Sequence, residues 1–221
     1  MREPHIRVMI VDDHAVVRQG YRRLLEEHGN IEVVAEAADA AAAYTEFKRT
    51  APGVVIMDIT MPGRGGIDAI RHIRQWDAAA RILVFSMHAN AAYALQAFRA
   101  GAKGYVTKSS DPELLVTAVK NVARNKPALC PEISEALAAS RLEDDAAALD
   151  SLSPREFEIL RLILDAKSTE EIAQAFNLAP KTVANYHYAI KSKLGVTSDI
   201  DLVYFCMRHG LVTPLHTLAQ P

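Results

Sequence analysis

The chain has 221 residues, half of them hydrophobic, so it can form one large domain or two small ones with buried cores, and we expect two. A formal net charge of -2 at pH 7 argues against a protein that is basic throughout and coats nucleic acid without discrimination. Cys130 and Cys206 lie far apart with no histidine at metal-ligand spacing, so they are expected to be reduced thiols, not part of a disulfide framework or a zinc site. No signal-type segment or membrane-length apolar run is present, and a soluble cytoplasmic protein with no membrane partner is expected.

Five short apolar runs alternate with helix-like segments in the first half of the chain. Their nearly continuous hydrophobicity is typical of parallel strands covered on both faces, and the alternation predicts a doubly wound α/β sheet. Gly101 is a predicted helix C-cap, and Asp111-Pro112 is a predicted helix start. The expected strands are Ile6–Val11, Ile31–Ala35, Val54–Met57, Ile82–Phe85 and Tyr105–Val106, and the expected helices are Val16–Glu27, Ala40–Arg49, Gly66–Gln75, Ala91–Ala100 and Glu113–Arg124.

The second half of the chain changes character after Asn125. Residues 130–150 are rich in alanine and acids and show no strand pattern, so we expect a partly helical linker. Beyond it the sequence predicts an all-α domain of four helices, because helix start signals recur and no strand pattern is present. Those signals are at Ser153, Ser168, Pro180 and Ser198. The expected organisation is residues 1–125 for the first domain, 126–150 for the linker, 151–214 for the second domain and 215–221 for a tail.

Polar side chains suited to phosphate chemistry follow four of the five predicted strands. Because the carboxyl ends of parallel strands meet at one edge of a doubly wound sheet, we expect these side chains to lie together. Clustered carboxylates bind Mg²⁺, and one of them can attack a phosphate donor to form an acyl phosphate. A lysine can pair with the added charge, and a hydroxyl can donate a hydrogen bond to the phosphate. The residues are Asp12 and Asp13 after the first strand, Asp58 after the third, Ser86 after the fourth and Lys108 after the fifth.

The order and spacing of these residues resemble the receiver domains of response regulators over residues 1–125. The matching pieces are Val11-Asp12-Asp13-His14, Met57-Asp58-Ile59-Thr60-Met61-Pro62-Gly63, Ser86, Tyr105 and Lys108. The resemblance implies a flavodoxin-like fold with five strands and phosphorylation of Asp58 by a partner sensor histidine kinase. It also implies Mg²⁺ held by Asp13, Asp58 and the backbone carbonyl of Thr60, with Asp12 nearby.

The resemblance further implies a conformational switch. Ser86 and Tyr105 are expected to rearrange when Asp58 is modified, which couples the site to the face formed by the fourth helix, the fifth strand and the fifth helix. A tyrosine in a strand also fits simple half-buried packing, so that alternative stays open for Tyr105. His14 and His72 are expected to be polar helix residues. Similar receivers often carry Asp or Asn where Gly65 stands, and we expect a more flexible loop here.

The last third of the chain has the pattern of a helix-turn-helix. A helix over Glu170–Phe176, a short turn and a longer helix over Pro180–Leu194 would place the second helix in the major groove of DNA. No Asp or Glu lies between Glu171 and Asp199, whereas three lysines do. Such segregation lets a domain of balanced charge present a positive edge to phosphates.

The second domain contains four short motifs, Leu152-Ser153-Pro154-Arg155-Glu156, Glu171-Ile172-Ala173, Pro180-Lys181-Thr182-Val183 and Lys193-Leu194-Gly195-Val196. They resemble the LuxR-type helix-turn-helix of the NarL/FixJ family. The further runs Lys181–Tyr188, Ser198–Leu202 and Arg208–Leu211 are most similar to its GacA/UvrY branch. Carried over by position, the resemblance implies base contacts by Ala184, Asn185 and Tyr188, and phosphate contacts by Lys181, Thr182, Lys191 and Lys193. Asn185 can pair with adenine, and Ala184 can contact a thymine methyl group.

The predicted function is therefore a DNA-binding transcription regulator that phosphorylation of Asp58 activates. A homodimer is expected to bind two half-sites of double-stranded promoter DNA, and RNA polymerase is a candidate further partner. Any catalysis is expected to be limited to the protein's own phosphoryl transfer and dephosphorylation. Three alternatives stay open: a flavodoxin-like phosphatase, a phosphorylation-independent adaptor that uses the first domain to bind protein, and a second domain that docks protein instead of DNA. Whether Tyr186 and Tyr188 stack on bases or pack against a neighbouring helix is also open.

Overall fold

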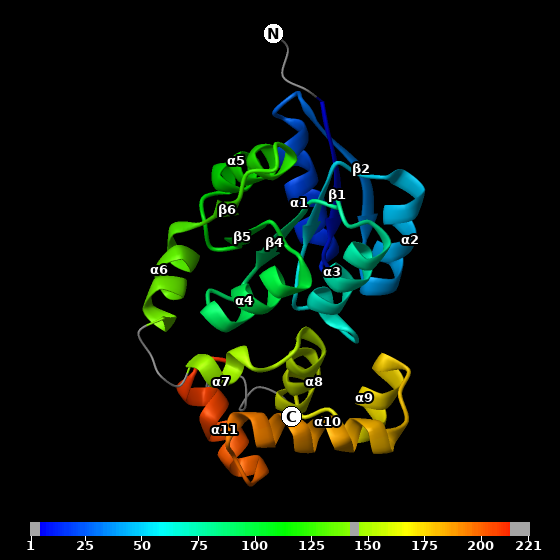
Figure 1. The fold of residues 1–221 in the computed structure, drawn as a ribbon. Helices are drawn as coiled ribbons and strands as arrows, with labels where there is room; N and C mark the ends of the chain where they lie inside the picture. Colours follow the sequence, from blue (N-terminus) through cyan, green and yellow to red (C-terminus); the bar gives the residue numbers. More distant parts are fainter. Residues whose placement is uncertain (1–4, 142–145, 213–221) are drawn as a thin grey trace.

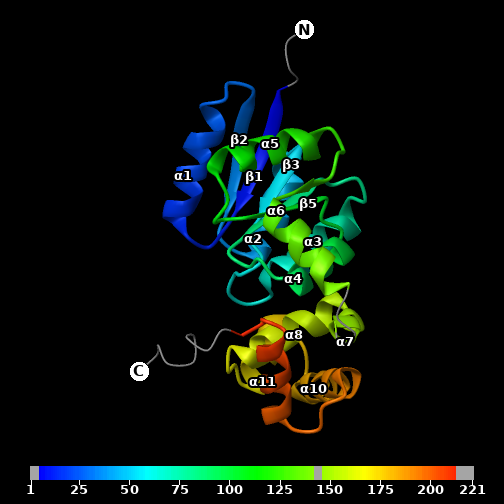
Figure 2. The ribbon, with the colours of Figure 1, turned by 90° about the vertical axis from the view of Figure 1, so that its left-hand side faces the viewer.

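The computed structural model describes residues 5–141 and 146–212, which form two domains stacked along one axis (Figures 1 and 2). The tail expected at 215–221, and residues 213–214 of the expected second domain, lie outside the described residues. The first domain consists of β1 Ile6–Val11, α1 Ala15–Glu26, β2 Ile31–Ala37, α2 Ala40–Thr50, β3 Val54–Met57, α3 Gly65–Trp76, β4 Ile82–Ser86, α4 Ala91–Ala100, β5 Gly104–Thr107, α5 Pro112–Ala123 and β6 Ala128–Leu129. The connection contains α6 Pro131–Ser140 and α7 Ala146–Asp150, and the second domain contains α8 Pro154–Leu164, α9 Thr169–Phe176, α10 Pro180–Leu194 and α11 Asp199–Arg208. We call the two units the N-terminal domain and the C-terminal domain.

The sheet of the N-terminal domain is parallel throughout, with the strand order β2-β1-β3-β4-β5-β6. It contains the five expected strands and adds β6, which falls in the segment expected to be linker. A strand of two residues is too short to show a hydrophobic period, so only its pairing with β5 reveals it. Gly104 permits that pairing, because a Cβ there would lie 2.7 Å from the carbonyl oxygen of Ala128.

Two hydrophobic layers lie on opposite faces of this sheet, because alternate residues of a strand point to opposite faces. In β1, Val8 and Ile10 belong to the layer under α1 and α5, whereas Met9 and Val11 belong to the layer under α2, α3 and α4. β1, β3, β4 and β5 are buried almost completely, as the continuous apolar runs predicted, whereas the edge strand β2 alternates buried and more exposed residues. The expected N-cap at Asp111 and the left-handed C-cap at Gly101 are both present.

Over its described residues, the C-terminal domain consists of four helices that begin at the predicted start signals. Ser153 and Ser168 each form a capping box with the glutamate three residues later, and Ser198 forms a third box with Asp201, which was not predicted. Ala179, which begins the longest of these helices, has no side-chain cap. Both cysteines are free and buried, in agreement with the expectation of reduced thiols.

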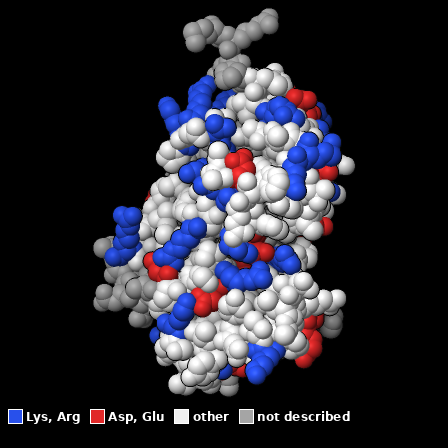
Figure 3. Space-filling model, turned by 45° about the vertical axis from the view of Figure 1, so that its right-hand side comes forward, with Lys and Arg blue, Asp and Glu red and all other residues white. Residues whose placement is uncertain are grey.

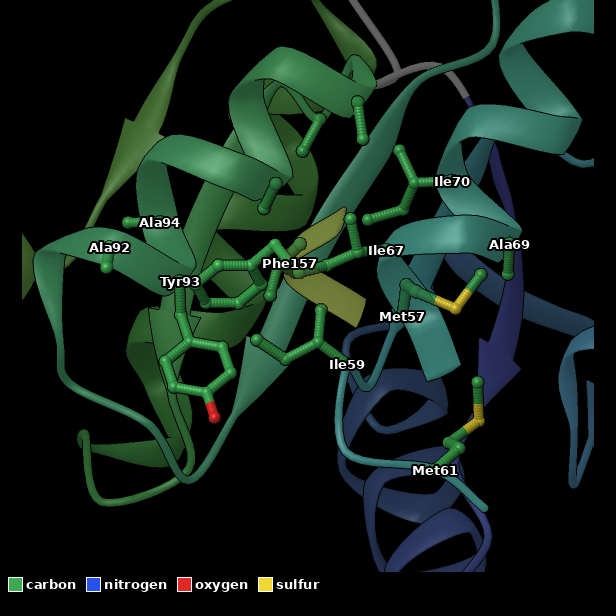
Figure 4. Close-up of a cluster of buried hydrophobic side chains, with 14 of the residues drawn as sticks. Met57, Ile59, Met61, Ile67, Ala69, Ile70, Ala92, Tyr93, Ala94 and Phe157 are labelled. Atoms are coloured by element: carbon green, nitrogen blue, oxygen red, sulfur yellow. The ribbon is translucent and has the colours of Figure 1, made fainter. Parts of the chain in front are cut away.

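The two domains share one hydrophobic core. Phe157 of α8 lies beside Tyr93, Ile67 and Ile59 of the N-terminal domain (Figure 4). The rings of Tyr93 and Phe157 meet edge to face, with centroids 5.1 Å apart. Contacts of α8 with α3 and α4 therefore hold the C-terminal domain against the edge of the N-terminal domain where the strands end.

Candidate functional site

A lysine whose side chain is 9% exposed joins two of the predicted carboxylates at the carboxyl edge of the sheet. Lys108 Nζ lies 2.6 Å from Asp12 Oδ2 and 2.6 Å from Asp58 Oδ2. Asp12 is 2% exposed and Asp58 3% exposed, so water screens this pairing little. Burial works to lower the pKa of Lys108, but its hydrogen bonds to Asp12 and Asp58 outweigh burial and raise that pKa. The site therefore holds a permanent positive charge against the carboxylate predicted to be modified.

The remaining oxygen of Asp58 is held by the chain that follows it. Asp58 Oδ1 accepts a hydrogen bond of 2.9 Å from the backbone N–H of Thr60. The two oxygens of Asp58 thus have different partners, one on the loop after β3 and the other on Lys108 after β5. A phosphoryl group added to either oxygen would disturb one of these bonds.

The acidic pair after β1 lies with a histidine in a group suited to a cation. Atoms of Asp12, Asp13 and His14 that can bind a metal lie within 4.8 Å of one another. Asp13 Oδ1 is buried without a hydrogen-bond partner among the described residues, although His14 Nδ1 lies 2.9 Å away. Mg²⁺ prefers carboxylate, carbonyl and water oxygens, so the carboxylates of Asp12 and Asp13 fit this ion.

His14 was not predicted to belong to this site. It was expected to be a polar helix residue, but it occupies the N-cap position of α1 beside the two carboxylates. Its backbone N–H donates to Asp12 Oδ1 at 2.8 Å. The position of His14 directly after Asp12 and Asp13 was the sequence feature that could have placed it in this site. His72 does lie on a helix, where it stacks on Tyr44 of α2 with ring centroids 4.2 Å apart.

The two predicted switch residues meet at the backbone of His88. Ser86 Oγ accepts from the N–H of His88 at 3.2 Å, and the Tyr105 hydroxyl donates to the carbonyl of His88 at 2.8 Å. Ser86 and Tyr105 are both fully buried, and burial raises the pKa of the Tyr105 hydroxyl. The ring of His88 stacks on Tyr93, which contacts Phe157. Sequence reasoning missed His88, because nothing in the local sequence indicates its bonds to the distant Tyr105.

The C-terminal domain forms one wall of the space around Asp58. A cavity of about 550 Å³ is bordered by Asp58 and Lys108 of the N-terminal domain and by Arg161 and Leu211 of the C-terminal domain. Arg161 also donates hydrogen bonds to the backbone carbonyls of Met61 and Gly63, at 3.4 and 3.3 Å. The loop that follows the predicted phosphoacceptor is therefore in direct contact with the C-terminal domain.

The helix-turn-helix presents its predicted base-reading residues to solvent. α9 and α10 are joined by a turn in which Asn177 adopts a left-handed backbone conformation. Ala184, Asn185 and Tyr188 are exposed on α10, and Tyr188 has 75% of its surface accessible. Tyr186, in contrast, is partly buried and packs against the core. The N-terminal domain packs on α8, which leaves the three predicted base-reading residues exposed.

The lysines predicted to contact phosphate differ in whether a carboxylate of this chain already pairs with them. Lys181 is exposed at the start of α10. Lys193 Nζ lies 2.6 Å from Glu156 Oε2, and Lys191 Nζ lies 2.9 Å from Asp199 Oδ1. The acid-free stretch of sequence is thus not free of acids in the fold, because α8 and α11 bring carboxylates back to it. Basic side chains also lie beside acidic ones at the level where the domains meet (Figure 3).

The fold and this acidic edge define the class of protein: a phosphoacceptor-type α/β domain joined to a helix-turn-helix domain. Residues 8–120 match the family model described as "Response regulator receiver domain", and residues 150–206 match "Bacterial regulatory proteins, luxR family". The chain belongs to the response regulators of the LuxR (NarL/FixJ) type, which confirms the predicted family, the fold class and the function of a DNA-binding transcription regulator.

Known proteins support the same assignment. Response regulator UvrY of Escherichia coli K12 is 36% identical over 93% of this chain and 95% of its own length. A LuxR-family two-component response regulator from Aurantimonas is 55% identical, with a TM-score of 0.62, over 63% of this chain and 99% of its own. RcsB of Salmonella enterica, solved bound to the promoter rprA with the phosphomimetic BeF3-, is 30% identical with a TM-score of 0.73, over 91% of this chain and 98% of its own.

Among helices in the described ranges, none has the length and apolarity to cross a membrane.

Proposed function

We propose that Asp58 is the phosphoacceptor and that its modification controls DNA binding by the C-terminal domain. The observation that carries this proposal is the bridge from Lys108 Nζ to Asp12 and Asp58, 2.6 Å on each side. An oxygen of Asp58 attacks the phosphorus of the donor, and the bond from phosphorus to the donor atom breaks with its electron pair leaving on the donor. The donor that we propose in the cell is the phosphohistidine of a sensor histidine kinase.

We propose that Asp12, Asp13 and Asp58, with the backbone carbonyl of Thr60, hold Mg²⁺ at this site. The grouping of ligand atoms of Asp12, Asp13 and His14 within 4.8 Å of one another supports this assignment. When bound, Mg²⁺ would neutralise charge on the transferring phosphoryl group. Lys108 adds the second positive charge, and it is already in contact with the acceptor carboxylate.

We propose that Ser86 and Tyr105 report the modification. A phosphoryl oxygen on Asp58 would be a charged acceptor for the Ser86 O–H, and charge-assisted hydrogen bonds are about twice as strong as neutral ones. Movement of Ser86 would change its bond to the backbone of His88, which also accepts from Tyr105. His88 would transmit that change, because its ring stacks on Tyr93 at the domain interface.

We propose that α10 reads the major groove of promoter DNA and that two copies bind together when phosphorylated. The exposed Ala184, Asn185 and Tyr188 support the base contacts, and the exposed Lys181 supports a phosphate contact. The apolar side chains of Ile200 and Tyr204 on α11 are 69% and 63% exposed, which supports α11 as the surface between the two copies.

Intact-protein mass spectrometry tests the central step. With Mg²⁺ and acetyl phosphate, the wild-type chain is expected to gain the mass of one phosphoryl group, and Asp58→Asn is expected to gain none. DNA affinity, measured on fragments selected from genomic DNA with the phosphorylated protein, is then expected to rise on phosphorylation in the wild type only. Equal affinity of wild type and Asp58→Asn after treatment would support the phosphorylation-independent adaptor instead.

A further inference from the structure

A carboxylate of the C-terminal domain is seated on the N-terminus of α3. Glu158, from the middle of α8, is fully buried, and its Oε1 accepts a hydrogen bond of 3.0 Å from the backbone N–H of Ile67. This N–H belongs to the first turn of α3, where backbone donors lack partners within the helix. We call the backbone of Gly65, Gly66 and Ile67 the Glu158 socket.

The socket exists because residue 65 has no side chain. A Cβ at Gly65 would lie 2.4 and 2.5 Å from the two oxygens of Glu158, well inside van der Waals contact. Gly65 also has a φ of +70°, a left-handed conformation that favours glycine. The loop was expected to be more flexible with glycine here, but the structure shows instead that the glycine makes room for a side chain of the other domain.

The neighbouring arginine ties the same carboxylate to the same loop. Arg161 Nε lies 3.0 Å from Glu158 Oε2, and the guanidinium group donates to the carbonyls of Met61 and Gly63. Both side chains are buried, Arg161 with 8% exposed and Glu158 with none. Both side chains come from α8, so separation of the domains would leave the pair intact but would take the N–H of Ile67 from Glu158 and the carbonyls of Met61 and Gly63 from Arg161.

We propose that Glu158 in this socket is the latch that holds the C-terminal domain on the N-terminal domain, and that Gly65 is the residue that permits it. The Glu158 socket follows the loop that connects Asp58 to α3. Gly66 packs so closely on this strand end that a Cβ there would lie 2.0 Å from the carbonyl oxygen of Asp58. The phosphoacceptor and the domain contact therefore share one short segment, and a change in that segment shifts the equilibrium between docked and separated domains.

A matched pair of glycines in this loop allows a sharp test. Gly63 has a φ of +75°, close to that of Gly65, but a Cβ added at Gly63 would have no described atom of another residue within 4 Å. Asn tolerates left-handed conformations better than most residues with a side chain, so Gly63→Asn and Gly65→Asn impose a similar backbone cost. Only Gly65→Asn places atoms against Glu158.

The experiment uses the full chain without a phosphodonor, so its outcome does not depend on the role proposed for Asp58. Small-angle X-ray scattering measures the radius of gyration, and hydrogen exchange with mass spectrometry measures protection of the peptide that contains Ile67. Gly65→Asn is expected to increase the radius of gyration and to speed exchange at this peptide by about ten- to a hundredfold, the range for loss of a hydrogen bond to a charged group. Gly63→Asn is expected to match the wild type.

A second set of variants keeps the test decisive if Gly65→Asn does not fold. Glu158→Ala is expected to give the same two changes, whereas Glu170→Ala, which removes an exposed glutamate of α9, is expected to give neither. In the Glu158→Ala background, Gly65→Asn should add nothing, because the atoms it would strike are gone. The proposal is overturned if Gly65→Asn and Gly63→Asn behave alike, if the effects of Gly65→Asn and Glu158→Ala add, or if Glu158→Ala leaves exchange at Ile67 unchanged.

Discussion

Tyr93 of α4 and Phe157 of α8 pack edge to face across the domain interface, with ring centroids 5.1 Å apart and ring planes at 90°. The contact links the aromatic side of the proposed switch to the first helix of the C-terminal domain, since Tyr93 also stacks on His88. Both rings are buried, and burial raises the pKa of the Tyr93 hydroxyl. The docked arrangement is therefore built from a hydrophobic contact beside a charged one.

Phe157→Ala is expected to weaken docking through lost packing. Truncation of a buried Phe costs about 3–5 kcal/mol, and part of that cost falls on the contact with α4. Hydrogen exchange in α4 is expected to speed up in this variant. Phe176→Ala, which truncates a buried Phe of α9, a helix that packs on α10, should leave exchange in α4 at the wild-type rate, and equal acceleration by both variants would contradict the role given to Phe157.

Lys108→Ala is expected to destabilise the N-terminal domain in the absence of Mg²⁺. Removal of one member of a buried ion pair leaves uncompensated charge and costs about 3–5 kcal/mol. Because the freed carboxylates of Asp12 and Asp58 repel each other, Mg²⁺ should restore more stability in this variant than in the wild type. Denaturant unfolding with and without Mg²⁺ measures both effects, with Lys103→Ala as the control at an exposed lysine before β5.

Docking is expected to weaken as the pH rises, with Glu158 as the titrating group. Burial raises the pKa of Glu158 from 4.5 to about 7, and Asp68 adds to this increase. The nearby Arg161 and the N–H of Ile67 favour the charged form and only partly offset the increase. The docked form binds the proton more tightly than the separated form, so each pH unit between the two values costs docking up to about 1.4 kcal/mol. The loss begins above pH 4.5 and levels off above about pH 7.

Scattering and hydrogen exchange at several pH values follow this titration. The groups facing Glu158 include Arg161 on its own helix, Asp68 on α3 and Tyr93 on α4. Asp68 is paired with Arg155 at 3.0 Å and with Arg71 at 2.8 Å. Glu158→Gln is expected to keep an acceptor for Ile67 and to flatten the pH response over this range. A response that persists unchanged in Glu158→Gln would assign the titration to another group.

The lysines of α10 are expected to separate into DNA contacts and structural contacts. Lys181→Ala should lower DNA affinity for all sequences and reduce the salt slope of binding by about one, as loss of one phosphate contact requires. Lys193→Ala should instead lower the melting temperature of the C-terminal domain, because Lys193 pairs with Glu156 of the α8 capping box. Affinity measured against salt concentration, together with thermal unfolding, distinguishes the two. A salt slope that Lys181→Ala leaves unchanged would remove Lys181 from the interface.

The elements of this protein follow largely from local sequence rules. Hydrophobic period and cap residues act within a few positions, so the five longer strands and the capping boxes at Ser153 and Ser168 were predictable. The meeting of Asp12, Asp58 and Lys108 was also predictable, because the topology of a parallel sheet brings strand ends to one edge. Each of these inferences needs only the order of residues and the geometry of one element type.

Only the tertiary structure decided how the two domains meet. The contact of Glu158 with Gly65 and Ile67 joins residues more than ninety positions apart, and no local pattern encodes it. The same holds for Lys193 and Glu156, which turn an apparent basic stretch into a paired one. Such contacts depend on how the surfaces of two folded units fit together. At Gly65, the absence of a Cβ atom is what allows the carboxyl group of Glu158 to be buried.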